Sequence, residues 1–338
     1  MGPIIMISYP NRLNLAQTPT PFYALDRLSE QLSKDIPSCP RIWIKRDDQS
    51  GCLTSGNKVR KLEFLLAEAM DNDCDTIITS GGVQSNHCRA AAVLGAQLGL
   101  RVHLLLRSDI KPQPVGNLLL DQLVGATISH YSQDEFKQLD QLFEGWQEQY
   151  TAQGSRCYLI PTGGSNGTGL WGYIAAAEEL GADFAKEGIE PGFIIHATGS
   201  GGTQAGLTMG CQLLNLSAKV HAYAVCDNSA YFHRKVSEDI QQWSQQYQIP
   251  VVEESLSIST NDSYIGPDYG LAGVEVFATI KHLAALEGII LDPVYTGKAF
   301  HGMIEQIKAG RYSDTSDIVF VHTGGLFGLL AQQDNLGY

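Results

Sequence analysis

The chain has 338 residues and a formal net charge of −13. This length suggests about two domains. A composition of 43% hydrophobic and 17% charged residues excludes a mainly disordered chain. An acidic chain without a basic block binds nucleic acid and anionic lipid poorly, and no stretch approaches the roughly 18 unbroken apolar residues of a membrane span. We therefore expect a globular protein whose partners include neither nucleic acid nor a membrane.

The cysteines and histidines predict neither disulfides nor a metal centre. The seven cysteines are scattered, Cys39 and Cys52 being the nearest pair, and neither C-x-x-C nor H-x-x-x-H occurs. Such a set is typical of reduced thiols in the cytosol, and the histidine spacing gives no zinc motif. Residues 1–13 lack the basic segment and the cleavage site of a secretory signal. The sequence thus predicts a cytoplasmic protein without a metal.

Short β-rich runs alternate with longer helical patterns along the chain. The predicted strands are 75–80, 101–107, 126–131, 157–161, 193–198, 220–226, 288–295 and 317–325. The predicted helices are 58–70, 87–99, 114–123, 134–150, 171–180, 203–214, 227–247 and 297–310. This alternation favours an α/β fold with largely parallel sheets that helices cover on both faces. The irregular stretch 249–270 is long enough to be a functional loop.

Four strand-to-helix junctions are rich in glycine, serine, threonine and asparagine. They are residues 81–86, 162–169, 198–203 and 322–325. Any one of them could be an ordinary turn or helix cap. In open parallel sheets, however, ligands bind beyond the carboxyl ends of the strands. Four such loops therefore predict a ligand site at that edge.

The junction TGSGGTQAG (198–206) predicts an anion site, because a strand leads in and a helix leads out. Gly199, Gly201 and Gly202 would let the backbone approach a phosphate closely. The third position of a dinucleotide fingerprint is Gln204, and the Gly-Lys-Ser/Thr of a nucleotide-binding P-loop is missing. The pattern indicates a cradle for the phosphate of a smaller ligand, with a plain capping turn as the alternative.

The segment SGNKVRKLEFL (55–65) predicts a helix that begins with basic residues. Ser55 or Asn57 can cap this helix, which places Lys58 in its first turn and Lys61 one turn later. The helix dipole and a neighbouring lysine both lower the pKa of an amine, which favours a nucleophile. The alternative is a solvated basic helix end. The helix would bury Val59, Leu62, Leu66 and Ala69 on one face.

The junction GGVQSNHCR (81–89) places Ser85, Asn86 and His87 at a helix start. Backbone amides there could hold a carboxylate, and Asn86 could bond a phenolic oxygen. The alternative is an ordinary serine or asparagine cap.

A hydrolase is a competing hypothesis. The segment GGSNG (163–167) matches G-x-S-x-G, the nucleophile elbow, with Ser165 as the nucleophile. Asp292 and His322 follow in the chain order of an α/β hydrolase. Short glycine and serine patterns match by chance in a chain with 35 glycines. A metabolite-binding protein without catalysis is a further alternative.

Six segments together resemble one known family, in order, from about residue 17 to the end. They are SGNKVRKLEFL (55–65), GGVQSNHCRA (81–90), PTGGSNGTGLWGY (161–173), GSGGTQAG (199–206), ILDPVYTGKA (290–299) and FVHTGG (320–325). The family is that of the pyridoxal-phosphate enzymes containing D-cysteine desulfhydrase and 1-aminocyclopropane-1-carboxylate (ACC) deaminase. Residues 224–232 look most like the plant-type D-cysteine desulfhydrases.

The resemblance implies pyridoxal 5′-phosphate as cofactor and fold type II, that of the tryptophan synthase β subunit. Lys58 would form the internal Schiff base, Asn86 would bond the 3′-oxygen, and Thr323 would lie by the pyridine nitrogen with Thr296 close to it. The residues implied for the cofactor phosphate are Lys61, Gly199, Ser200, Gly201, Gly202 and Thr203. Those implied for the substrate are Ser85, which would also transfer a proton, Asn86, His87, Tyr269 and Tyr295.

The resemblance also implies a domain organisation. Residues 1–57 and 166–338 would form a large cofactor-binding domain. Residues 58–165 would form a small domain that closes over the substrate and excludes water. Family members are commonly homodimers.

The implied reaction is β-elimination of D-cysteine to pyruvate, ammonia and hydrogen sulfide. The deaminases of the family carry a glutamate after the tyrosine of V-Y-x-G-K and an apolar residue in the late x-G-G loop, where this chain has Thr296 and Thr323. A neutral hydroxyl beside the pyridine nitrogen makes a weaker electron sink than a carboxylate, which suits a good leaving group such as sulfide. We expect D-cysteine to be preferred; ACC deaminase and cysteate sulfo-lyase are the alternatives.

Overall fold

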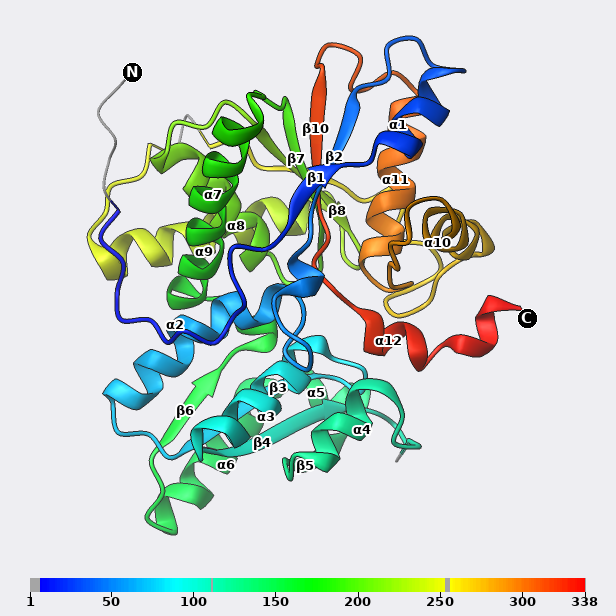
Figure 1. Ribbon diagram of the computed structural model, residues 1–338. Helices are drawn as coiled ribbons and strands as arrows, with labels where there is room; N and C mark the ends of the chain where they lie inside the picture. The colour runs from blue at the N-terminus through cyan, green and yellow to red at the C-terminus, as the bar shows by residue number, and fades with distance from the viewer. Residues whose placement is uncertain (1–6, 111, 253–255, 338) are drawn as a thin grey trace.

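The computed structural model describes residues 7–110, 112–252 and 256–337. Two sheets lie one above the other, with the helix α2 (Asn57–Asp71) crossing between them (Figure 1). Two segments named above lie partly outside the described residues. They are residues 1–6 of the N-terminal segment 1–13 and residues 253–255 of the irregular stretch 249–270. Within the described residues, no helix combines the length and the apolar character that crossing a bilayer requires.

The larger sheet has six strands drawn from both ends of the chain. Its order is β1 (Phe22–Ala24), β2 (Arg41–Lys45), β10 (Asp317–Val321), β7 (Phe193–Thr198), β8 (Lys219–Ala224) and β9 (Ser259–Asn261). Among the described strands of this sheet, the edge pair of β1 and β2 is antiparallel and the other neighbouring pairs are parallel. The late strand β10 therefore lies between an early strand and a middle one.

The smaller sheet is built from one continuous part of the chain. Its order is β5 (Thr127–Tyr131), β4 (Arg101–Arg107), β3 (Thr76–Gly82) and β6 (Cys157–Ile160), all parallel. The helices that accompany it are α3 (Asn86–Leu98), α4 (Gly116–Leu123), α5 (Gln133–Phe136) and α6 (Leu139–Ala152). The prediction of an α/β fold with two mostly parallel sheets is confirmed.

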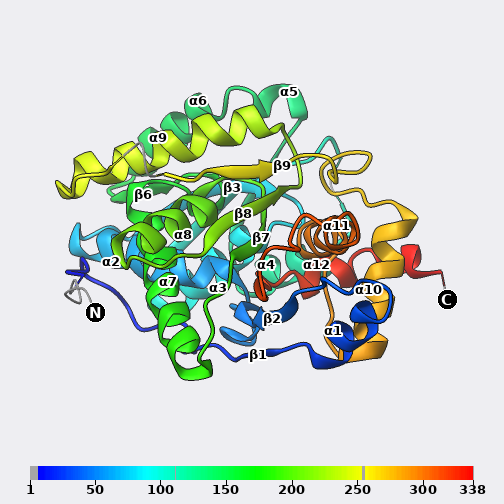
Figure 2. The ribbon, with the colours of Figure 1, turned by 90° about the horizontal axis from the view of Figure 1, so that it is seen from above.

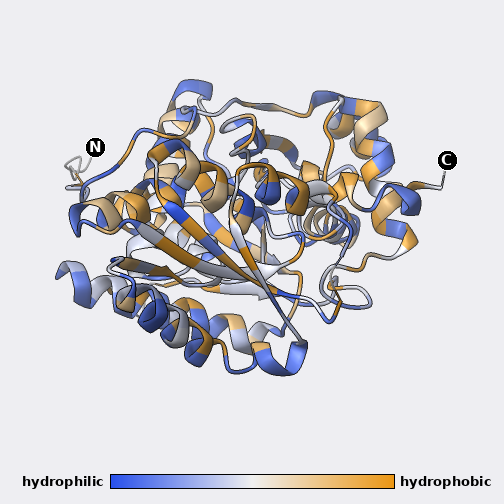
Figure 3. Cartoon of the chain, turned by 90° about the horizontal axis from the view of Figure 1, so that it is seen from below, coloured by the Kyte–Doolittle hydropathy of each residue, from blue (hydrophilic) through white to orange (hydrophobic). Residues whose placement is uncertain are grey.

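Helices cover both faces of the larger sheet, which explains why its strands are apolar on both sides. Ile318 and Phe320 of β10 pack in one core, and the alternate residues Val319 and Val321 pack in another. One face carries α7 (Gly167–Glu187), α8 (Gly202–Leu213) and α9 (Ser229–Tyr247); the other carries α1 (Asp26–Ser33), α10 (Val274–Glu287) and α11 (Thr296–Lys308) (Figures 1 and 2). The short helix α12 (Leu326–Leu330) follows β10. Blue and orange bands alternate along the outer helices, as expected where one helix face is buried (Figure 3).

Two predicted elements differ from the observed ones. The apolar run 288–295 is not a strand, because the Asp292 carboxylate accepts hydrogen bonds from the backbone N–H groups of Val294, Tyr295 and Thr296 and folds the run into a turn. The predicted helix 134–150 is two helices, α5 and α6, with a break at Lys137 and Gln138. The strands β1 and β2 and the helices α1 and α10 were not predicted.

The helix α2 is buried on nearly all sides, although it carries many charges. The four apolar residues predicted to face inward, Val59, Leu62, Leu66 and Ala69, pack in the core of the smaller sheet. On its other side, Glu63 accepts hydrogen bonds from the backbone N–H groups of Leu15 and Ala16. The N-terminal segment is therefore fastened to α2.

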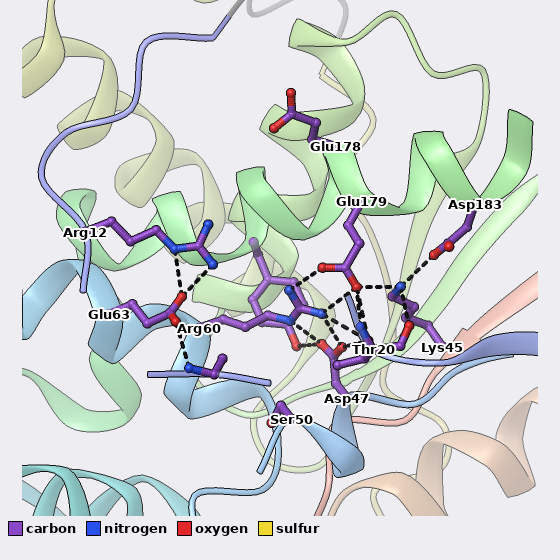
Figure 4. Close-up of polar contacts among 12 residues, drawn as sticks. Arg12, Thr20, Lys45, Asp47, Ser50, Arg60, Glu63, Glu178, Glu179 and Asp183 are labelled. Atoms are coloured by element: carbon purple, nitrogen blue, oxygen red, sulfur yellow. Dashed lines mark hydrogen bonds and ion pairs between the residues drawn. The ribbon is translucent and has the colours of Figure 1, made fainter. Parts of the chain in front are cut away.

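A buried ion-pair network joins α2 to the larger sheet and to α7 (Figure 4). Arg60 donates to both oxygens of Asp47, at 2.7 and 3.0 Å, and to Glu179 at 3.0 Å. Lys45 of β2 pairs with Glu179 and Asp183. Burial alone would raise the pKa of Glu179, but the hydrogen bonds and charges of Arg60 and Lys45 outweigh it and lower that pKa to about 2. The network holds α2 against α7 through ion pairs that are mostly shielded from water.

Candidate active site

A cavity of about 570 Å³ opens where the four glycine-rich junctions meet. This volume is within the usual range for a cofactor or small-molecule site. The predicted residues that line it are Lys58, Ser85, Asn86, His87, Gly199, Ser200, Gly201, Thr203, Tyr269, Tyr295 and Thr323. Lys61, Gly202 and Thr296 are buried outside that lining. The predicted convergence of the four loops is thus observed.

Lys58 enters the cavity from the first turn of α2. The helix begins at Asn57, and the residue before it is Gly56, with φ +107° and no side-chain cap. Ser55 and Asn57 were predicted as possible caps, but neither side chain caps the helix. The Asn57 amide donates instead to Thr203 Oγ1 at 3.0 Å. A Cβ at Gly56 would lie 2.7 Å from the carbonyl oxygen of Thr323. Glycine is needed here because the chain turns directly against the 322–325 loop.

The amine of Lys58 is chemically unusual. It donates a long hydrogen bond to the carbonyl of Gly163, at 3.4 Å, and within the described part of the chain no carboxylate pairs with it. Burial lowers the pKa of Lys58 from 10.5 to about 8. A larger fraction of the amine is therefore neutral near physiological pH than in an ordinary lysine, as a nucleophile requires.

Lys61 and the loop before α8 form a cluster of donors. Lys61 Nζ lies 3.2 Å from both the Gly163 carbonyl and Ser165 Oγ. Ser165 Oγ also lies 2.9 Å from Ser200 Oγ and accepts from the Gly202 N–H at 3.3 Å. A Cβ at Gly202 would stand 2.7 Å from Lys61 Nζ. Burial and the nearby Lys58 charge hold the pKa of Lys61 well below its usual value.

This geometry argues against the hydrolase hypothesis. Ser165 is engaged with Lys61, Ser200 and Gly202. Both ring nitrogens of His322 are occupied, Nε2 by the Ile290 carbonyl and Nδ1 by the Gly324 N–H. The Asp292 carboxylate caps its own turn. The three residues do not form a triad, and Ser165 belongs to the donor cluster around Lys61.

The start of α3 presents one hydroxyl and one amide to the cavity. Ser85 is the N-cap, and its oxygen accepts from the Cys88 N–H at 3.1 Å. The acceptor near its O–H proton is the sulfur of Cys88, which is a weak acceptor. Asn86 Oδ1 accepts from Asn117 Nδ2 at 3.1 Å, which leaves the Asn86 amide nitrogen toward the cavity. Ser85 therefore caps the helix and also carries a proton that a ligand can accept.

His87 is buried beside the two lysines. Thr79 donates its hydroxyl proton to the Ile160 carbonyl and so accepts from His87 Nε2, at 2.8 Å. His87 Nδ1 is then a bare acceptor, with no partner among the described residues. Burial, together with the charges of Lys58 and Lys61, holds the pKa of His87 well below 6.5. The ring is neutral at physiological pH.

Two tyrosines face each other on the opposite wall. The hydroxyls of Tyr269 and Tyr295 are hydrogen-bonded to one another, and the ring of Tyr295 lies against Gly199. Burial raises the pKa of both phenols. Both phenols therefore stay protonated. One O–H donates to the other tyrosine oxygen, and the second O–H can donate into the cavity.

Thr323 and Thr296 occupy different environments. Thr323 lines the cavity, and its backbone carbonyl accepts from the Asn57 N–H at 3.1 Å. Thr296 is fully buried and donates its hydroxyl to Asp292 at 2.7 Å. The hydroxyl of Thr296 is thus used within the Asp292 turn, and a role for Thr296 beside Thr323 stays a prediction.

Sequence reasoning missed several residues of this site. Arg107 and Cys226 line the cavity, and Ser165, considered above only as a nucleophile, is hydrogen-bonded within the cluster around Lys61. Arg107 lies over the ring of Tyr269, 5.8 Å from its centroid. Asp268 comes from the irregular 249–270 stretch, whose length was the only signal for it.

The fold and the donor set together define an enzyme that uses pyridoxal phosphate. Residues 13–324 match the family described as "Pyridoxal-phosphate dependent enzyme", and the chain belongs to this family. Its architecture is fold type II: a crystal structure described as that of an ACC deaminase homologue superposes with a TM-score of 0.87 at 34% identity, covering 97% of this chain and 95% of that one. A fungal L-serine ammonia-lyase from Rhizomucor miehei, 16% identical with a TM-score of 0.65, shares the fold.

Curated relatives match over nearly the whole chain. The bifunctional D-cysteine desulfhydrase/1-aminocyclopropane-1-carboxylate deaminase of Arabidopsis thaliana, a mitochondrial protein, is 40% identical over 96% of this chain and 80% of its own length. The D-cysteine desulfhydrase of Klebsiella pneumoniae (strain 342) is 39% identical over 96% and 97%. The chain is thus similar to proteins named for both activities considered above.

The residues present fit the cofactor. A buried lysine amine with a lowered pKa can bind an aldehyde covalently. Lys61, two serine hydroxyls and the backbone at a helix N-terminus form a donor set that suits a phosphate. Gly202 leaves open the space that a Cβ would fill beside Lys61.

Proposed function

We propose that this enzyme carries out β-elimination on D-cysteine, releasing pyruvate, ammonia and hydrogen sulfide. The observation that carries the proposal is Thr323, a neutral hydroxyl on the cavity wall in the loop that follows β10. A weaker electron sink suffices where the leaving group is as good as sulfide. The names of the relatives from Arabidopsis and Klebsiella support the same substrate.

The chain's own residues would divide the work as follows. Lys58 would bind the cofactor covalently, and Lys61, Ser165 and the 199–203 loop would hold its phosphate. Asn86 would donate to the ring oxygen of the cofactor, and the N-terminal amides of α3 would hold the substrate carboxylate. When bound, pyridoxal phosphate supplies the electron sink that an elimination needs.

Proton handling would fall to three groups. The Lys58 amine, with a pKa of about 8, would take up a proton near the substrate α-carbon. Ser85 would donate its O–H within the same region, since the Cys88 sulfur beside it is a weak acceptor that a ligand can replace. The pair of Tyr269 and Tyr295 would keep one O–H toward the substrate. Positioned proton transfer of this kind is typically worth about 10²–10⁴-fold in rate.

A matched substrate panel tests this proposal. Values of kcat/KM are measured for D-cysteine, L-cysteine, ACC and cysteate, with detection of sulfide, pyruvate and sulfite. D-cysteine should give the highest value and release sulfide and pyruvate in equal amounts. A higher value for ACC, or no turnover of D-cysteine, would show that the substrate assignment is wrong.

The domain organisation, assembly and location are proposed with it. Residues 58–165 would act as a small domain that closes on the remainder, since the smaller sheet supplies Ser85–His87 while the larger one supplies the phosphate loop. The enzyme would be a cytoplasmic homodimer. Light scattering on the purified protein decides between one chain and two, and small-angle scattering with and without substrate tests closure.

A further inference from the structure

Asn117, on α4, is a fully buried amide whose orientation is fixed from three sides. Its Oδ1 accepts from Arg89 Nε at 2.7 Å. Its Nδ2 donates to the Gln84 carbonyl at 3.0 Å and to Asn86 Oδ1 at 3.1 Å. An amide has donors at one end and an acceptor at the other. Turning Asn117 over would place a donor against Arg89 and an oxygen against two oxygens.

The consequence for Asn86 is that its two ends are no longer equivalent. Because Asn117 offers an N–H, Asn86 must meet it with Oδ1. The nitrogen of Asn86 is then left for the cavity, where the proposed contact is an oxygen of the cofactor ring. If the Asn86 amide were turned over, its oxygen would face the cavity and would meet the proposed oxygen of the cofactor ring, so that no hydrogen bond could form there.

Arg89 extends this control to the loop before Lys58. It is fully buried in α3, and besides Asn117 it donates to the backbone carbonyls of Leu53 and Ser55, the latter at 2.9 Å. Its guanidinium also lies 4.9 Å from the ring centroid of Phe327 in α12. The planar fork of an arginine can hold several acceptors in one fixed geometry. One side chain therefore sets both the path into α2 and the direction of the Asn86 amide.

We propose that Arg89 and Asn117 are positioning residues that keep the Asn86 amide nitrogen turned toward the cofactor. Neither residue lines the cavity, so both act through Asn86. This inference rests on the proposed cofactor contact of Asn86. Variants of Asn86 and of Asn117 test the contact and the positioning role separately.

The substitution Asn117→Asp isolates the effect. An aspartate keeps the acceptor for Arg89 but loses both donors, which frees the Asn86 amide to turn its oxygen into the cavity. We expect pyridoxal-phosphate binding by the cofactor-free protein to weaken about tenfold, as when a buried hydrogen bond is replaced by an unmatched pair. The pH at which the visible absorption of the bound cofactor changes should rise, because the ring oxygen loses a donor that stabilises its anion.

A double-mutant cycle distinguishes positioning from general loss of structure. Asn86→Ala, Asn117→Asp and the combined variant are compared by cofactor titration and by the absorption midpoint. The combined variant should match Asn86→Ala alone, because Asn117 has nothing left to orient. Effects that add would overturn the proposal. The exposed cap Asn228, whose side-chain oxygen accepts from the Tyr231 N–H, supplies the control Asn228→Asp, which should leave both readouts unchanged.

The outcomes also separate this inference from the proposed function. If Asn86→Ala changes neither readout, the cofactor contact assigned to Asn86 fails. If Asn86→Ala changes both while Asn117→Asp changes neither, only the positioning role fails. Should Asn117→Asp not fold, Asn86→Asp places an oxygen toward the cavity directly and must weaken cofactor binding more than Asn86→Ala does. An equal or smaller loss would contradict the orientation inferred here.

Discussion

Lys58 and Lys61 stand one helical turn apart on α2, but their amines have different surroundings. Lys58 reaches the open cavity, whereas Lys61 is enclosed by Gly163, Ser165 and the start of α8. Similar residues on one helix face can therefore have separate roles, one covalent and one electrostatic.

Substitution of each lysine should reveal this division. Lys58→Ala should abolish covalent attachment of pyridoxal phosphate and nearly all turnover, because it removes the one lysine among the described residues that line the cavity. Lys61→Ala should keep the attachment but weaken cofactor retention. Borohydride reduction followed by peptide mapping identifies the labelled residue, and dialysis measures retention. A label on a lysine other than Lys58 would contradict the assignment.

The pH dependence of cofactor capture follows from the lowered pKa of Lys58. Above a pKa of about 8 the amine is mostly neutral and reactive, and below it the amine is protonated and unreactive. The rate at which cofactor-free protein binds pyridoxal phosphate covalently should rise with pH and level off above about 8. Stopped-flow absorbance at saturating cofactor measures it. A rate that keeps rising toward pH 10.5 would indicate an ordinary lysine.

At the scale of elements, the loop between β7 and α8 depends on glycine for space as well as for conformation. Gly202→Ala should weaken cofactor binding at least about tenfold, because the added Cβ would meet Lys61 Nζ and Ser165 Oγ within 2.7 Å. Gly145→Ala in α6 is the matched control, since a Cβ there meets nothing within 4 Å. Titration of both cofactor-free variants tests this. Equal affinities would show that the loop is not the cradle.

Most of the parallel strands could be predicted because each is a short apolar run between helical patterns. The strand β2, RIWIK, was missed because charged residues bound an apolar core of only three residues. The run 288–295 was misread as a strand because its apolar residues were given more weight than Asp292-Pro293, a pair that favours a turn. The strand β2 is fixed by pairing with β1 and with the distant strand β10. The turn at 292–296 is fixed by hydrogen bonds from backbone N–H groups to Asp292.

The site was predictable where a motif keeps its residues together, and less so where partners are distant in sequence. Ser85, Asn86 and His87 follow one strand and could be grouped from the sequence. Ser165 meets Lys61 across 104 positions, and no local pattern distinguishes it from a nucleophile. Thr296 was placed beside Thr323 by motif alone, and only the structure shows that its hydroxyl is used by Asp292.

At the scale of the whole molecule, the network around Arg60 joins parts of the chain that are far apart in sequence. Arg60→Met should lower the free energy of unfolding by about 3–5 kcal/mol, because Asp47 would remain buried without its cation. Arg156→Met is the control: its pair with Asp73 is mostly exposed and should contribute at most about 1 kcal/mol. Urea unfolding of the two variants compares them. Equal losses would show that burial does not set the strength of the pair.

The position of β10 in the larger sheet has a consequence for biosynthesis. This strand lies between β2 and β7, and the loop after it supplies Thr323, whose carbonyl receives the Asn57 N–H beside Lys58. During translation the smaller sheet, complete by residue 160, can assemble while the ribosome is still adding the rest of the chain. The larger sheet has a gap at its centre until residues 317–321 emerge. A nascent chain that ends before residue 317 therefore lacks both the strand between β2 and β7 and the loop that carries Thr323.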